Sequence, residues 1–208
     1  MPNLKFVFGR LFALLLLIIT GLASPLTADA QNQDKTVPFE ALFDQRFAAE
    51  RMQGVRWMQD GRFFSSLNET EDDVEIRKND IITGRYAVLV RQSQLIPESS
   101  DQPIKIEGYQ FSADEQKILI ETEVEKIWRR STKAHYYVYD LQDEALTKLT
   151  DSNVKQQFAE FSPQGNRVSF VRNNNLFWVD LSTGKEHQIT SDGEEGHIIN
   201  GASDWVYE

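Results

Sequence analysis

The sequence predicts an all-β fold, a partial β-propeller of about three to four blades, preceded by a signal peptide and a short helix. An internal repeat is the first observation: Tyr109–Ile120 and Ala159–Phe170 both place a Phe-Ser turn motif before an apolar strand. Each copy then reaches an aromatic strand ending in Asp-Leu and a short strand ending in threonine, at Thr150 and Thr190. Four short strands joined by tight turns and repeated are the unit of a propeller blade.

Composition limits the possible functions. The 208 residues are 40% hydrophobic and 26% charged, which is typical of a globular protein. A net charge of −10 and a sequence pI near 4.9 argue against nucleic acid as a partner. The absence of cysteine excludes disulfides, thiolate metal sites and a cysteine nucleophile. The 3 histidines share no ligand-like spacing, so we expect neither a metal site nor a cofactor.

Residues 1–30 have the layout of a secretory signal peptide. Lys5 and Arg10 form a basic segment, Leu11–Leu22 is an apolar run, and an Ala-x-Ala site ends at Ala30. We expect cleavage near Ala30, no stable membrane span afterwards, and a periplasmic or secreted mature protein beginning at Gln31. An uncleaved N-terminal anchor is the alternative. Export without cysteine favours a bacterial periplasm or cell exterior.

The segment Thr36–Met52 predicts a short amphipathic helix that packs on the domain. Pro38 suits a first helical turn, and Phe39, Leu42 and Phe43 fall on one helical stripe. This segment implies no chemistry.

After Gly54 the hydrophobic period changes to two. Trp57–Leu67, with its Asp-Gly turn, predicts a hairpin that opens an earlier, degenerate blade. Three further segments receive simple interpretations: a polar surface excursion with some short strand at Asn68–Asp80, a strand at Tyr86–Val90, and a loop at Pro97–Pro103.

The second repeat copy shows which face is buried. Val168 and Phe170 alternate with Arg167 and Ser169, so we expect one apolar and one wetter face. The run Asn173–Asn175 supplies residues that tolerate the positive φ of a hairpin turn. Packing between blades is the first interpretation of all the aromatic residues in these strands.

The first copy is longer than the second between its second and third strands, by the segment Thr122–Thr132. An extension there projects from one end of a propeller, where binding loops gather. It carries Arg129 and Arg130, and guanidinium groups suit carboxylates and carbonyls. The alternative is local pairing with a nearby acidic residue: Glu121, Glu123 or Glu125.

The sequence lacks the common catalytic motifs. Gly201–Trp205 begins like a serine elbow but has tryptophan at the final glycine position, and no phosphate loop, zinc motif or dinucleotide fingerprint occurs. We therefore expect no catalysis by this chain alone. Asn200–Glu208 has the pattern of a strand interrupted in its middle, and the blade count falls short of a closed propeller. Both features indicate the front part of a longer protein.

Three features together resemble the dipeptidyl peptidase IV family, in particular the N-terminal half of a bacterial secreted member. They are the Phe-Ser-x-Asp repeats, the extension Glu125–Ser131 leading to Tyr136–Leu141, and the terminal stretch Asn200–Glu208. Many propellers share the repeats, whereas Asp-Trp-Val-Tyr-Glu after Asn-Gly is highly specific. The resemblance covers Thr36–Glu208.

The resemblance implies a serine exopeptidase with an eight-bladed propeller over a C-terminal α/β-hydrolase domain. Such enzymes release Xaa-Pro, or less well Xaa-Ala, dipeptides from peptide substrates with a free N-terminus, and the propeller gates access and anchors that terminus. Residues 31–208 would be the N-terminal portion of the propeller. The catalytic serine, aspartate and histidine would lie in the absent hydrolase domain, so no catalytic residue is assigned here. A homodimer of the longer protein is a further implication.

Two substrate-binding residues follow from the resemblance. Glu208 matches the first glutamate of an acidic run whose next two glutamates hold the substrate's α-ammonium group. Arg129 matches the arginine that holds a substrate carbonyl beside them, and Arg130 takes that role if the alignment shifts by one.

Two other functions stay open. One is a non-catalytic exported propeller that binds peptide or polysaccharide, and the other is a peptidase of the wider prolyl oligopeptidase group. Endopeptidases of that group lack the glutamate anchor, so the residues after Glu208 discriminate between them.

Overall fold

The structure is a computed structural model that describes residues 38–43, 47–49, 53–203 and 206. The chain divides into two compact units, Met1–Ala49 and Glu50–Glu208. The predicted signal peptide lies outside the described residues, as does part of the predicted helix at 36–37, 44–46 and 50–52.

The described part of the first unit contains one short 3-10 helix, η1 (Phe39–Leu42). Residues 47–49 form a turn and coil, so the prediction of a helix over Thr36–Met52 is wrong in its extent. No side chain caps the helix at Pro38, and so short a helix has little stability of its own. Phe39 is 70% and Phe43 73% exposed, and the predicted packing of the helix on the domain stays a prediction.

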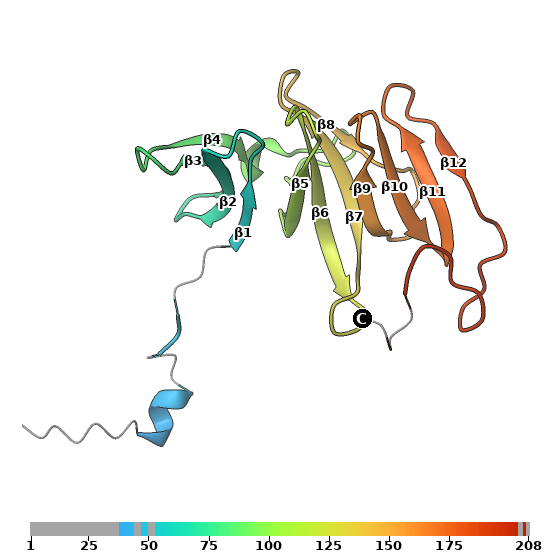
Figure 1. Ribbon diagram of the computed structural model, residues 1–208, viewed down its shortest axis with the longest axis horizontal. Helices are drawn as coiled ribbons and strands as arrows, with labels where there is room; N and C mark the ends of the chain where they lie inside the picture. Colours follow the sequence, from blue (N-terminus) through green and yellow to red (C-terminus); the bar gives the residue numbers. More distant parts are fainter. Residues whose placement is uncertain (1–37, 44–46, 50–52, 204–205, 207–208) are drawn as a thin grey trace, which may run out of the picture. The chain divides into compact units, whose positions relative to one another are not determined.

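The second unit is all-β, which confirms the predicted fold class. Its strands form three four-stranded antiparallel sheets, each in sequential order, and each is one blade of a partial propeller (Figure 1). One short 3-10 helix, η2 (Gln92–Gln94), follows the first blade. The first blade comprises β1 (Gln53–Trp57), β2 (Phe63–Glu69), β3 (Val74–Asp80) and β4 (Tyr86–Arg91). The second comprises β5 (Gly108–Phe111), β6 (Lys117–Lys126), β7 (Thr132–Asp140) and β8 (Ala145–Lys148). The third comprises β9 (Gln157–Phe161), β10 (Arg167–Arg172), β11 (Asn175–Asp180) and β12 (Glu186–Gln188).

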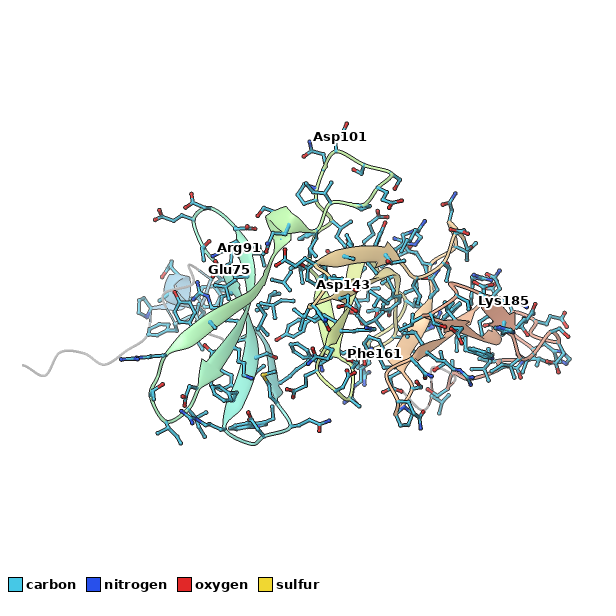
Figure 2. All side chains as sticks on the ribbon, turned by 90° about the horizontal axis from the view of Figure 1, so that it is seen from above. Glu75, Arg91, Asp101, Asp143, Phe161 and Lys185 are labelled. Atoms are coloured by element: carbon cyan, nitrogen blue, oxygen red, sulfur yellow. The ribbon has the colours of Figure 1, made fainter. Side chains whose placement is uncertain are left out.

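The polar segment 68–80 is part of a regular hairpin, so its interpretation as a surface excursion is wrong. β2 and β3 pair without interruption from Phe63↔Asp80 to Glu69↔Val74. The charges that suggest a loop in the sequence neutralise each other across the sheet: Glu75 contacts Arg77 at 2.7 Å on its own strand and Arg91 at 3.3 Å on β4 (Figure 2).

The repeated motifs are turn chemistry. An aspartate ends the third strand of every blade, and its Oδ1 accepts two backbone N–H groups of the following turn at Asp80, Asp140 and Asp180. The serine of each Phe-Ser motif closes the turn that follows it: Lys117 N donates to Ser112 Oγ at 2.9 Å and Arg167 N to Ser162 Oγ at 3.2 Å. These bonds satisfy backbone groups that a tight turn leaves unpaired.

Burial differs between the second and third blades. In β6, Ile118, Leu119 and Ile120 are consecutive and all 0% exposed, because the second blade packs on both faces. Ile118 and Ile120 share a cluster with Ile76 of the first blade, and Leu119 shares another with Phe170 of the third. In β10 the predicted alternation is confirmed, with Val168 and Phe170 buried and Arg167 and Ser169 exposed.

Candidate functional site

The sequence extension is a two-stranded ribbon that lengthens β6 and β7 beyond the other strands of their blade. Its tip spans residues 127–131, where Ile127 N donates to the carbonyl of Ser131 at 2.9 Å. The ribbon starts at a bulge, because the register shifts between Thr122 and Glu125 and Glu123 adopts a positive φ of 52°. A bulge increases local twist and re-aims the strand beyond it.

The ribbon forms one wall of a pocket of about 720 Å³. The other walls are the β8–β9 loop, the start of β9, the β10–β11 turn and the loop after β12. Among the pocket's lining residues are Trp128, Ser131, Lys133, Val154, Lys155, Phe158, Asn174, Glu195, Ile199 and Ser203. The second and third blades are joined beside the pocket by reciprocal backbone bonds between Ala134 and Gln156, at 2.9 and 2.8 Å. This bridge positions the β8–β9 loop against the ribbon.

A carboxylate shared by two lysines gives the pocket its polar side. Glu125 lies 2.9 Å from Lys133 Nζ and 3.6 Å from Lys155 Nζ. The hydrogen bond from Lys133 lowers the pKa of Glu125, and the charges of both lysines add to this shift. The carboxylate is therefore ionised at neutral pH.

The other two glutamates of the ribbon have partners of their own. Tyr136 Oη donates to Glu121 at 3.5 Å, and Glu123 lies 3.9 Å from His135 Nε2. Burial lowers the pKa of His135, and its Nδ1 is buried without a hydrogen-bond partner within the described residues. Among those residues, no ion pair joins Arg129 to any of these glutamates, so the local-pairing alternative is not supported for Arg129.

The structure brings only part of the predicted site into view. Arg129 is exposed at the ribbon tip, and its neighbours Trp128 and Ser131 line the pocket. Arg130 is also exposed. Glu208 lies outside the described residues, so its proximity to Arg129 stays a prediction, as do the roles of both residues.

The pocket also has an apolar side that sequence reasoning missed. Four large apolar side chains from separate segments lie exposed around it: Trp128, Val154, Phe158 and Ile199. Phe158 adopts a positive φ of 53° beside a register shift in β9–β10 pairing. Such backbone strain costs about 1–3 kcal/mol and occurs preferentially at functional sites. In the sequence Phe158 looks like an ordinary strand residue, so only the bulge identifies it.

Within the described residues, no group of three or more histidine, aspartate or glutamate side chains is arranged to hold a metal ion. No helix in the same part of the chain is long and apolar enough to cross a membrane.

Comparison with known proteins assigns the family. Residues 112–208 match the model of the dipeptidyl peptidase IV N-terminal region. Prolyl endopeptidase FAP of Mus musculus is 32% identical over 143 residues, which cover 68% of this chain and 18% of that protein. A probable dipeptidyl-aminopeptidase B of Podospora anserina is 41% identical over 99 residues, covering 47% of this chain and 11% of that protein.

The fold agrees with the sequence comparison. The crystal structure of Porphyromonas gingivalis dipeptidyl peptidase 4 superposes with a TM-score of 0.72 at 31% identity, covering 84% of this chain and 24% of that one. The chain thus spans about a quarter or less of the length of these relatives. The family-model match, these relatives and this superposition show that the chain belongs to the dipeptidyl peptidase IV family, as part of the N-terminal propeller region.

Proposed function

We propose that this chain provides the peptide-anchoring face of a serine-type dipeptidyl peptidase. Its propeller admits peptides and holds their free N-terminus beside the ribbon tip. The observation that carries the proposal is a convergence: the ribbon around Arg129 and the loop leading to the acidic terminal stretch line one pocket. Guanidinium donors suit a substrate carbonyl, and carboxylates suit an α-ammonium group. Charge-assisted bonds of this kind contribute about 1.5–3 kcal/mol each.

Peptide binding to the longer protein, in which the residues after Glu208 supply the two further glutamates of the anchor, tests the proposal. Calorimetric titration with a short Xaa-Pro peptide should show binding that weakens when the peptide is N-acetylated, because acetylation removes the positive charge. Arg129→Ala should weaken binding of the free-amine peptide roughly 10- to 100-fold. Arg85→Ala is the matched control, since Arg85 is also exposed but lies in the β3–β4 turn of the first blade.

Two outcomes would contradict this function. Equal affinity for the free and acetylated peptides would show that the N-terminus is not anchored. An equal loss of peptide affinity in Arg85→Ala and Arg129→Ala would show that only the net charge of the chain matters. A loss in Arg130→Ala alone would transfer the carbonyl-binding role to that residue.

Catalysis is proposed for a longer protein in which the residues after Glu208 supply two more glutamates and a serine hydrolase domain. Release of Xaa-Pro dipeptides from a chromogenic substrate by that protein is the expected activity. A longer protein that cleaves only internal proline bonds would instead be an endopeptidase.

We also propose that the chain is exported. The layout of residues 1–30 supports this, with the Ala-x-Ala site ending at Ala30. N-terminal sequencing of the protein recovered from a bacterial periplasm should begin at Gln31. A start at Met1 in a membrane fraction would favour the uncleaved anchor.

A specific observation keeps the non-catalytic alternative open. Trp128 is 59% and Phe158 50% exposed at the pocket, and aromatic faces of this kind also stack on sugar rings. Oligosaccharides that compete with the peptide in the same titration would favour a polysaccharide-binding propeller.

A further inference from the structure

The asparagine run at the β10–β11 turn does more than reverse the chain. Asn173 and Asn174 supply positive φ angles of 50° and 57°, as a two-residue hairpin turn requires, and this confirms the sequence prediction. The third residue, Asn175, is only 8% exposed and already belongs to strand β11. The turn does not require its side chain, so the amide is available for another purpose.

The Asn175 side chain makes three hydrogen bonds to two different parts of the structure. Its Nδ2 donates to the carbonyl of Asn173 at 3.0 Å. Its Oδ1 accepts from Thr190 Oγ1 at 3.1 Å and from the backbone N–H of Gly193 at 2.9 Å. Thr190 Oγ1 in turn accepts from Leu176 N at 3.0 Å, so the end of the third blade and the loop after it meet at one amide.

The far end of this loop returns to the same turn. Asn200 N donates to the carbonyl of Asn174 at 3.0 Å, and Asn200 Nδ2 donates to Asp192 Oδ1 at 3.0 Å. Between these ends, Glu194 and Ile198 exchange backbone hydrogen bonds of 2.9 and 2.8 Å. The segment 193–200 is therefore held at one end by Asn175 and at the other by Asn174; we call it the clamped loop.

Two glycines permit the close approach. A Cβ at Gly193 would lie 2.3 Å from the carbonyl oxygen of Asn174. Gly201 has a φ of +77°, and a Cβ there would lie 2.5 Å from Leu176 Cδ2. The loop thus contacts the turn with its backbone, at positions where a side chain would separate the two.

The clamped loop faces the ribbon across the pocket. Glu195, Gly196 and Ile199 line the pocket, as do Ala202 and Ser203 just beyond the loop. The chain then continues toward the acidic terminal stretch. A change at Asn175 therefore alters the wall opposite Arg129 without touching the ribbon itself.

We propose that Asn175 is a positioning residue for the peptide site: its side-chain amide holds the clamped loop so that the pocket wall stays at a fixed distance from the ribbon. The effect on peptide binding rests on the proposed function, whereas the clamp itself rests on the hydrogen bonds of Asn175. The amide acts through Gly193 and Thr190 and is not itself expected to contact a peptide.

The test uses spin labels on introduced cysteines, and because the sequence contains no native cysteine, only the chosen positions are labelled. Lys126→Cys and Glu195→Cys place labels on exposed positions of the ribbon and of the clamped loop. Pulsed electron paramagnetic resonance on the full chain should give one narrow distribution of distances between the two labels. This distribution should broaden when Asn175→Ala is added. Amide hydrogen exchange of Gly193 and Asn200 should accelerate by about tenfold or more in Asn175→Ala.

Two comparison variants separate positioning from general destabilisation. Asn175→Asp keeps the Oδ acceptor for Gly193 and Thr190 but loses the donor to the Asn173 carbonyl, so it should broaden the distribution less than Asn175→Ala does. Asn79→Ala removes an asparagine whose Nδ2 donates to Ser66 Oγ at 2.9 Å in the first blade. It should lower stability without changing the distance distribution.

Peptide titration completes the test. In the longer protein, Asn175→Ala should weaken peptide binding roughly tenfold or more, Asn175→Asp should weaken it less, and Asn79→Ala should leave it unchanged. An unaltered distance distribution and exchange rate in Asn175→Ala would overturn the clamp. A broadened distribution with unchanged peptide affinity would overturn the positioning role. If the longer protein with the residues after Glu208 binds no peptide, the proposed function fails, and the labels and exchange rates of this chain still decide the clamp.

Discussion

The packing of the second blade on both faces makes a quantitative prediction about two adjacent residues of β6. Ile118 and Leu119 are each 0% exposed, but they belong to separate clusters on opposite faces of one sheet. Replacing either by alanine removes buried carbon atoms and leaves a cavity, which costs about 2–5 kcal/mol of unfolding free energy. Ile118→Ala should loosen contact with the first blade, and Leu119→Ala contact with the third.

Urea unfolding followed by tryptophan fluorescence measures both losses. The midpoint should fall in each variant while the slope stays constant, because the surface exposed on unfolding is nearly unchanged. The control is Ser169→Ala in β10, an exposed position of the third blade between two buried residues, which should change stability by less than about 0.5 kcal/mol. If Leu119→Ala behaves like this control while Ile118→Ala shows the full loss, the third blade does not pack on the second.

Three further predictions concern single contacts. Tyr109→Phe should lower the unfolding free energy by about 1–3 kcal/mol in the same assay. The substitution removes a buried hydroxyl that bonds to Ser65 Oγ at 2.9 Å and to the Gly54 carbonyl. An unchanged unfolding free energy would show that water replaces the hydroxyl. Glu144→Gly should raise the unfolding free energy by about 1 kcal/mol. Glu144 has a φ of 52° at a turn position where the other two blades have glycine. A lower unfolding free energy in the variant would show that the contacts of the Glu144 side chain outweigh its backbone strain. The hydrogen bond from Lys117 lowers the pKa of Asp140, so the stability it contributes is present above the unfolded pKa of about 4 and is lost as pH falls below it. Asp140→Asn should flatten the loss of unfolding free energy between about pH 4 and pH 2, and an unchanged slope would assign that loss to other carboxylates.

Comparison of the blades shows why sequence reasoning failed at the first one. Asp80-Ile81 matches the Asp-Leu pairs that end the third strands of the other blades, and this was the available signal. The charges around Glu75 hid it, because they suggest solvent rather than a sheet. Their neutralisation by Arg77 and Arg91 depends on pairing between strands, which local composition does not show.

Part of the candidate site could be predicted from the sequence, and part of it could not. The extension and its arginines are visible as a length difference between two repeat copies. The lysines on Glu125, the strained Phe158 and the clamp at Asn175 come from segments separated by whole strands. No sequence periodicity relates these residues, so the sequence pattern does not predict that they line or support one pocket.

The sequence by itself determined the repeat, the strand faces and the turn residues, because alternation and turn chemistry act over a few neighbouring residues. It also indicated the family, through the resemblance of its extension and its terminal motif. Only the tertiary structure decided which strand is buried on both faces, how the pocket is walled and what holds its loop. Those features arise when blades pack on one another, and residues far apart in the chain then share contacts that neither repeat copy encodes alone.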